Sequence, residues 1–94
     1  MADTAIDTNA MLVIIKQDMG ITGTAFDNRL TNCINEVVRF MKSSGVTEEK
    51  INSSVGVVSR GASDLFYKRP DYSPIFYTDV FQLKRECEAG NVQT

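Results

Sequence analysis

Histidine is absent from this 94-residue chain, and cysteine occurs only twice, at Cys33 and Cys87. A chain without histidine cannot build a Cys–His nucleophile, and with no CxxC pair either it lacks the usual set of zinc ligands. The sequence also contains no glycine-rich phosphate loop, no HExxH motif and no GxSxG motif. We therefore expect no enzymatic activity, no catalytic residue, no cofactor and no bound metal.

Long hydrophobic runs are missing as well, since none approaches the 18 or more apolar residues of a membrane-spanning helix. Asp3 and Asp7 lie where a signal peptide would carry positive charge. We therefore expect neither secretion nor a membrane partner. In a reducing compartment the two cysteines are predicted to be buried free thiols, with a disulfide between them as the alternative.

What the chain does contain is the composition of an ordinary globular domain. Hydrophobic residues make up 43% and charged residues 23%, and the net charge is −2. This length predicts one domain covering residues 1–94. The mildly acidic balance argues against a dedicated nucleic-acid binder, which would normally carry a basic face.

The clearest helical pattern covers residues 24–44. Its apolar residues recur at three- and four-residue steps, as expected for one core-facing stripe: Phe26, Leu30, Cys33, Ile34, Val37, Phe40 and Met41. Thr24 can cap the first turn. Gly45 is a natural left-handed stop, which lets Val46 fold back onto Met41. This helix is predicted to organise the core.

Three further helices are predicted, over residues 8–19, 48–67 and 74–89, with a leader at 1–7 and a tail at 90–94. Asp7 or Thr8 caps the first, although the apolar run 11–15 also fits a buried strand. Thr47 caps the second, Ser73 and Pro74 begin the third, and Gly90 ends it. The short turn at 45–47 predicts an antiparallel hairpin at the centre of an all-α, four-helix bundle.

The side of the third predicted helix away from its apolar stripe is rich in small residues. Such a surface would let another chain approach closely, and the alternative is an ordinary solvated face. The candidate subunit-interface residues are Ser53, Gly56, Ser59, Arg60, Ser63 and Tyr67.

Charged residues elsewhere favour surface roles. Glu48 and Glu49 suit a helix N-terminus, and Asp64 is expected to be a helix-surface charge. The pairs 68–69 and 84–85 could form a small basic spot for an acidic partner or DNA phosphate, or lie on a solvated surface. A helix-turn-helix DNA-binding motif is disfavoured because the phosphates of DNA would repel Glu48 and Glu49. A small helical DNA-binding or regulatory protein remains the alternative function.

Taken together, these patterns resemble the head–tail connector proteins (adaptor or head-completion proteins) of long-tailed double-stranded DNA bacteriophages. The resemblance covers about residues 11–87 and rests on degenerate helical motifs. These motifs are Lys16-Gln17-Asp18-Met19-Gly20-Ile21-Thr22 followed by Asp27-Asn28-Arg29-Leu30, then Ser44-Gly45-Val46, then Val57-Val58 leading to Ala62-Ser63-Asp64-Leu65-Phe66-Tyr67, and Tyr77-Thr78-Asp79-Val80-Phe81-Gln82-Leu83-Lys84. Residues 1–10 have no counterpart in this pattern.

The resemblance implies a structural virion protein made in the host cytoplasm and located at the head–tail interface. Such proteins form a ring, usually a dodecamer, under the portal protein. The ring extends the DNA channel, through which packaged DNA passes without sequence-specific binding, and gives the stopper or tail-completion protein a docking platform. On this chain the resemblance implies subunit contacts on the small-residue face. It also implies portal contacts at Glu88, Ala89, Gly90, Asn91, Val92, Gln93 and Thr94.

Overall fold

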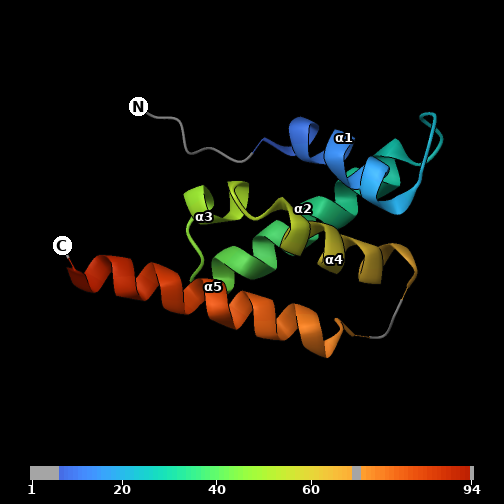
Figure 1. The fold of residues 1–94 in the computed structure, drawn as a ribbon. Coiled ribbons are helices and arrows are strands. Elements are labelled where there is room, and N and C mark those ends of the chain that lie inside the picture. The colour runs from blue at the N-terminus through green and yellow to red at the C-terminus, as the bar shows by residue number, and fades with distance from the viewer. Residues whose placement is uncertain (1–6, 69–70, 94) are drawn as a thin grey trace.

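Every regular element of the described residues is a helix (Figure 1). The computed structural model describes residues 7–68 and 71–93, with side chains through residue 88. Its helices are α1 (Thr8–Met19), α2 (Asp27–Ser44), α3 (Glu48–Asn52), α4 (Val55–Phe66) and α5 (Pro74–Gln93). The predicted all-α class is confirmed, and the strand alternative for residues 11–15 is wrong.

Helix α1 has the predicted bounds because both of its ends are capped. The Asp7 carboxylate accepts a hydrogen bond from the backbone N–H of Ala10 at 3.0 Å. At the other end Gly20 adopts a left-handed φ of 72°. There the N–H of Ile21 reaches back to the carbonyl of Lys16 at 2.9 Å, which closes the last turn.

Helix α2 begins at Asp27, three residues later than the sequence predicts. Residues 24–26 form a turn instead, in which the Thr24 carbonyl accepts from the Asp27 N–H at 3.2 Å. Phe26 takes the N-cap position and is 45% exposed, so it does not belong to the buried stripe. The first turn of α2 is stabilised by α1, because the Lys16 ammonium pairs with the Asp27 carboxylate at 2.8 Å.

The end of α2 follows the prediction closely. Gly45 has a φ of 107°, and the N–H of Val46 bonds to the Met41 carbonyl at 3.0 Å. Val46 is buried in consequence. Thr47 then caps α3, accepting from the Lys50 N–H at 3.2 Å.

The single helix predicted over residues 48–67 is wrong, because two serines interrupt it. Helix α3 ends at Asn52, where the Ser53 hydroxyl donates to the Lys50 carbonyl at 3.0 Å. Ser54 leaves the helical region, with φ −125° and ψ 47°, before α4 begins. The Ser53 hydroxyl competes with the helix for a backbone carbonyl, which favours a break next to this residue. The two long helices of the predicted hairpin are therefore joined through α3.

Helix α5 begins as predicted and extends further than predicted. The Ser73 hydroxyl accepts from the N–H of Phe76 at 3.3 Å, and Pro74 is the first helical residue. The helix continues past Gly90 to Gln93, so the predicted stop at Gly90 is wrong, as is a non-helical tail over 90–93. A single glycine costs only about 1 kcal/mol in a helix interior, too little to end one reliably.

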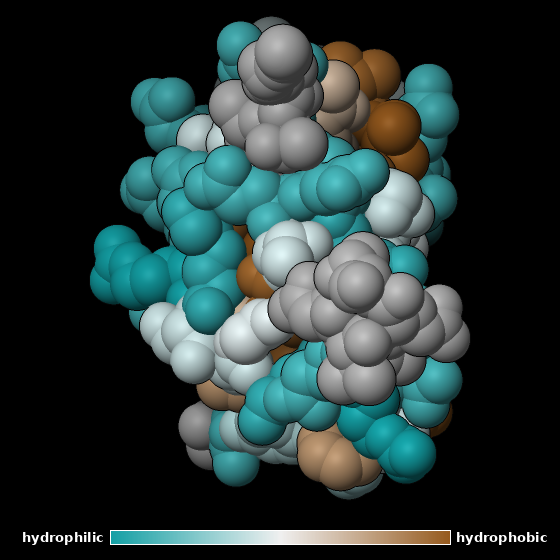
Figure 2. Space-filling view, turned by 90° about the vertical axis from the view of Figure 1, so that its left-hand side faces the viewer, coloured by the Kyte–Doolittle hydropathy of each residue, from teal (hydrophilic) through white to brown (hydrophobic). Residues whose placement is uncertain are grey.

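The core lies around α2, which packs chiefly against α4 and also against α1 and α5. In Figure 1, α1 and α5 lie at opposite edges of the molecule, with α2 and α4 between them. The fully buried large side chains come from every helix: Met11, Ile15, Leu30, Ile34, Val37, Met41, Ile51, Val58 and Phe76. The side that carries α3 is mostly hydrophilic, with a small hydrophobic group at the upper right of Figure 2.

Candidate functional site

Five of the six candidate interface residues converge on one hollow beside α4. The hollow has a volume of about 440 Å³ and is lined by Gly56, Ser59, Arg60, Ser63 and Tyr67, together with Asp18, Met19 and Asp64. Ser53 is exposed at the end of α3 and does not line it. We call this feature the α4 hollow.

The small residues of the α4 hollow differ in what they contribute. Gly56 is exposed, and a Cβ added there would meet no atom within 4 Å. Ser59, in contrast, is only 7% exposed, so the expectation that it lies away from the core is wrong. The space in front of Gly56 is therefore open to an outside group, while Ser59 forms the floor.

The close helix approach within the chain uses a different glycine, Gly61. A Cβ added there would lie 2.5 Å from the ring of Phe76, a distance that real Cβ atoms essentially never show. The aromatic ring of α5 thus packs directly onto the α4 backbone. Sequence reasoning missed this contact because Gly61 lies beside the apolar stripe and its partner is distant in the chain.

Two polar side chains at the hollow tie it to the rest of the fold. Arg60 pairs with Asp79 of α5 at 3.3 Å. Asp64 is 6% exposed and accepts from the backbone N–H of Ser73 at 2.9 Å. The expectation of a surface charge at Asp64 is therefore wrong, since this carboxylate fixes the residue that caps α5.

The end of α4 is fixed by a cation from α2. Arg29 donates a hydrogen bond to the Phe66 carbonyl, and its guanidinium lies 4.3 Å from the centroid of the Phe66 ring. A positive charge at a helix C-terminus is favourable because the last carbonyls lack partners within the helix. Tyr67 follows, 58% exposed, at the rim of the hollow.

A second concave surface, which sequence reasoning also missed, lies between α2 and α5. This groove has a volume of about 390 Å³, and its apolar lining comes from Phe40, Tyr77, Val80 and Phe81. Lys84 lines it too, with its side-chain carbons about 3.5 Å from the position of a Cβ on Gly45. We call this feature the α2/α5 groove.

One wall of the groove belongs to a cluster of four aromatic rings. Phe40 of α2 lies 5.1 to 5.9 Å from the rings of Tyr72, Phe76 and Tyr77. Burial raises the pKa of the Tyr72 hydroxyl, and a hydrogen bond to Asp71 raises that of Tyr77. Ring pairs at these separations are favourable, so the cluster stabilises this wall of the groove.

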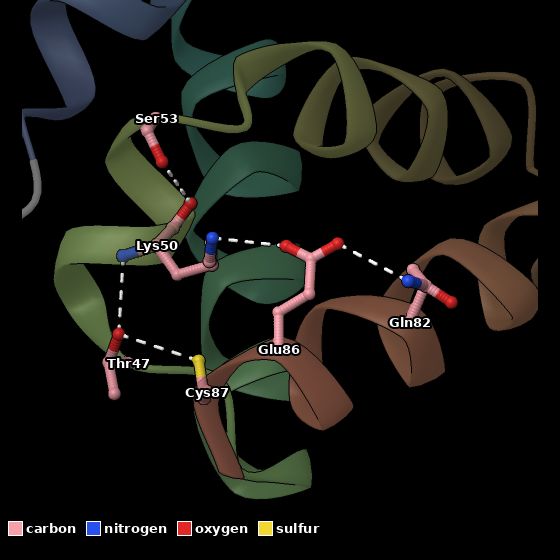
Figure 3. A network of polar contacts seen from close by, with 6 residues as sticks. All are labelled: Thr47, Lys50, Ser53, Gln82, Glu86 and Cys87. Carbon is pink, nitrogen blue, oxygen red and sulfur yellow. Dashed lines mark hydrogen bonds and ion pairs between the residues drawn. The ribbon is translucent and has the colours of Figure 1, made fainter. Parts of the chain in front are cut away.

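Helix α3 is fastened to α5 by polar contacts (Figure 3). Lys50 pairs with Glu86 at 3.0 Å, and Gln82 donates to the other carboxylate oxygen of Glu86 at 3.3 Å. These contacts lower the pKa of Glu86, and the Glu86 carboxylate raises the pKa of Lys50. The hydroxyl of Thr47 lies 3.7 Å from the Cys87 sulfur.

Both cysteines are free thiols, as predicted, but each is only half-buried. The alternative disulfide is therefore wrong, and the predicted burial is only partial, with both cysteines packed against the core. Burial raises the pKa of the Cys33 thiol, and the nearby Arg29 charge opposes that rise. Neither thiol has a histidine beside it, because the chain has none.

The remaining sequence candidates do not form one site. Lys68 lies two residues beyond the end of α4, whereas Lys84 lies against Gly45 at the end of α2. These two helix ends point to opposite sides of the molecule (Figure 1). Arg69 lies outside the described residues, so the basic spot stays a prediction. Of the candidate portal segment, Glu88 is exposed, residues 89–93 are described as helical backbone, and Thr94 lies outside the description.

Over the part of the chain that the structure describes, no group of three or more Cys, Asp or Glu side chains is placed to hold a metal ion. Nor does any helix in that part have the length and apolar character needed to cross a bilayer. In comparisons with known proteins, the chain matches no family model, no curated protein and no solved structure.

Proposed function

We propose that this chain is a head–tail connector subunit of a long-tailed bacteriophage. In this role it forms a ring, of twelve subunits in the usual case, under the portal protein. The ring extends the DNA channel and offers a platform to a stopper or tail-completion protein, with the helices arranged as a bundle around the α2 and α4 hairpin. The support is the sequence resemblance together with the α4 hollow.

The α4 hollow is the observation that carries the proposal. A subunit in a closed ring uses one surface against a different surface of its neighbour. The hollow collects candidate interface residues from α4 and its C-cap, and the backbone at Gly56 is open to an approaching chain. A surface hollow of mixed polarity suits such a contact with a neighbouring subunit, whereas a small-molecule site is normally more apolar.

The test is co-sedimentation with purified portal complexes. Wild-type protein is expected to bind the portal, and Gly56→Gln is expected to fold but fail to bind, because its side chain fills the space in front of α4. Gly56→Ala is the matched control, since it adds a single methyl group where no neighbour lies within 4 Å. Wild-type protein that never binds a portal would overturn the proposal, and equal binding by Gly56→Gln would place the interface elsewhere.

The alternative, a helical DNA-binding or regulatory protein, is tested by a gel-shift assay with duplex DNA at physiological salt. The connector proposal predicts no sequence-specific shift. Glu48 and Glu49 lie at the N-terminus of α3, where a groove-reading helix would approach the phosphates. A specific shift that survives competitor DNA would favour the alternative.

A further inference from the structure

The outer face of α1 carries apolar side chains that no part of the described chain covers. Val13 is 58% exposed and Ile14 is 43% exposed, whereas Met11 and Ile15 on the inner face are buried. Asp18 lies one turn further along, exposed, at the edge of the α4 hollow. The α1 face is thus an apolar ridge with an acidic end that continues into the candidate interface.

The α2/α5 groove has the opposite character in shape and in charge. It is concave, and Phe81 on its rim is 59% exposed while Tyr77 is 39% exposed. Lys84 lines it, and the Arg85 guanidinium lies 5.9 Å from the centroid of the Phe81 ring. The groove is therefore apolar with a basic rim.

The charged side chains at these two surfaces, Asp18, Lys84 and Arg85, take part in none of the ion pairs of the described residues. The two surfaces also cannot meet within one molecule, because α1 and α5 lie at opposite edges (Figure 1). An acidic apolar ridge and a basic apolar groove on opposite edges are complementary between two copies of the chain.

We propose that the occupant of the α2/α5 groove is the α1 face of a second copy of this chain. Val13 and Ile14 enter the groove against Phe40 and Phe81, and Asp18 approaches Lys84. The contact is head-to-tail, so each copy keeps one ridge and one groove free for further copies. This inference rests on the proposed function. It identifies the surface of the neighbouring subunit that contacts the α1 side of the α4 hollow.

The packing mode follows from ordinary helix recognition. A helix whose apolar side chains project as a ridge binds by inserting them into an apolar groove between two other helices. Opposite charges at the rim fix the direction of the inserted helix and disfavour wrong registers.

The test is disulfide trapping between copies. We expect an equimolar mixture of Ile14→Cys and Phe81→Cys proteins to give a crosslinked dimer under mild oxidation. A double variant carrying both cysteines is expected to give a ladder of higher species, because the contact is head-to-tail. The background level of crosslinking is measured with each single variant alone and with the unsubstituted protein, which carries Cys33 and Cys87. Arg39→Cys, which places an exposed thiol on α2 outside the groove, is the partner control.

Charge reversal provides the second measurement. Asp18→Lys or Lys84→Asp alone, introduced into the cysteine pair, is expected to lower the crosslinked yield about tenfold, and both together are expected to restore it. The proposal is overturned if Ile14→Cys couples to Arg39→Cys as readily as to Phe81→Cys. It is also overturned if the single charge reversals leave the yield unchanged while circular dichroism shows folded protein.

These outcomes are separable from those of the portal experiment. A ladder without portal binding would keep the self-contact and remove the connector role. Portal binding without a ladder would keep the connector role and remove this interface.

Discussion

At the residue scale, two glycines of α4 have different structural roles. Gly61 is required because the Phe76 ring occupies the place of its Cβ, whereas Gly56 faces open space. Sequence reasoning placed Gly56 on the small-residue face where another chain could approach closely. Gly56 is the second residue of α4 and Gly61 lies near its middle, and the path of α5 fills the space at Gly61 while leaving it open at Gly56.

We expect Gly61→Ala to lower the free energy of unfolding by about 1–3 kcal/mol, because the added methyl group must displace a buried ring. Gly56→Ala is the matched control and is expected to be neutral or to stabilise by up to about 1 kcal/mol, since alanine is the better helix former. Urea unfolding followed by circular dichroism measures both. Equal effects of the two substitutions would mean that α5 does not pack on α4 at Gly61.

Asp64 provides a second residue-scale prediction. Asp64→Ala leaves the partly buried N–H of Ser73 without its carboxylate acceptor and is expected to cost about 1–3 kcal/mol. Asp18→Ala, which removes an exposed carboxylate that has no ion pair among the described residues, is expected to stay within about 0.5 kcal/mol of wild type. If Asp64→Ala has only a small effect in urea unfolding, Asp64 behaves as a surface charge in solution and does not fix Ser73.

At the element scale, the short helix α3 depends on its contacts with α5. A helix of five residues is too short to be stable by itself, because nucleation is costly and few hydrogen bonds follow it. Ile51 is fully buried, and Lys50 and Thr47 reach Glu86 and Cys87 (Figure 3). The break at Ser53 and Ser54 is therefore compatible with a stable α3.

The Lys50–Glu86 pair makes a pH-dependent contribution to stability. The pKa of Glu86 is lower in the folded protein than its usual value of 4.5, so the folded state favours the ionised form. The contribution is present above pH 4.5 and is lost as the pH falls through the lowered pKa. We expect Lys50→Met to reduce the loss of stability between about pH 7 and about pH 3, measured as the shift in urea midpoint. An unchanged pH dependence in Lys50→Met would mean that the pair does not form in solution.

At the scale of the whole molecule, one core connects all five helices of the described residues. Leu30 is fully buried in α2, which contacts α1, α4 and α5. We expect Leu30→Ala to destabilise the protein by about 2–5 kcal/mol. The unfolding transitions seen in the far-ultraviolet (helices) and near-ultraviolet (tyrosine) regions are expected to shift together. Separate shifts would mean that the aromatic cluster around Phe40 unfolds independently of the core.

Much of the fold was predictable where the determining signal is local. Caps and stops at Asp7, Gly45, Thr47 and Ser73 act through hydrogen bonds within a few residues, so reading them required no tertiary information. The apolar stripe of α2 predicted Leu30, Ile34, Val37 and Met41 as core residues, and all four are fully buried.

The candidate site was less predictable because it depends on which helices become neighbours. Helical periodicity placed five of the six candidate interface residues on a face that does line a hollow. It could not show that Ser59 is buried, since α1 also packs against α4. The α2/α5 groove was invisible in the sequence because its residues come from segments about forty positions apart along the chain.

The sequence by itself determined the helical class, most helix ends and the identity of the central helix, because these follow from hydrogen bonds and periodicity along one segment. Tertiary structure alone decided that Gly61 admits Phe76, that Asp64 is buried and that apolar surfaces remain on α1 and beside α5. The physical reason is that burial is a property of two surfaces in contact. A pattern along one helix specifies only one of those surfaces.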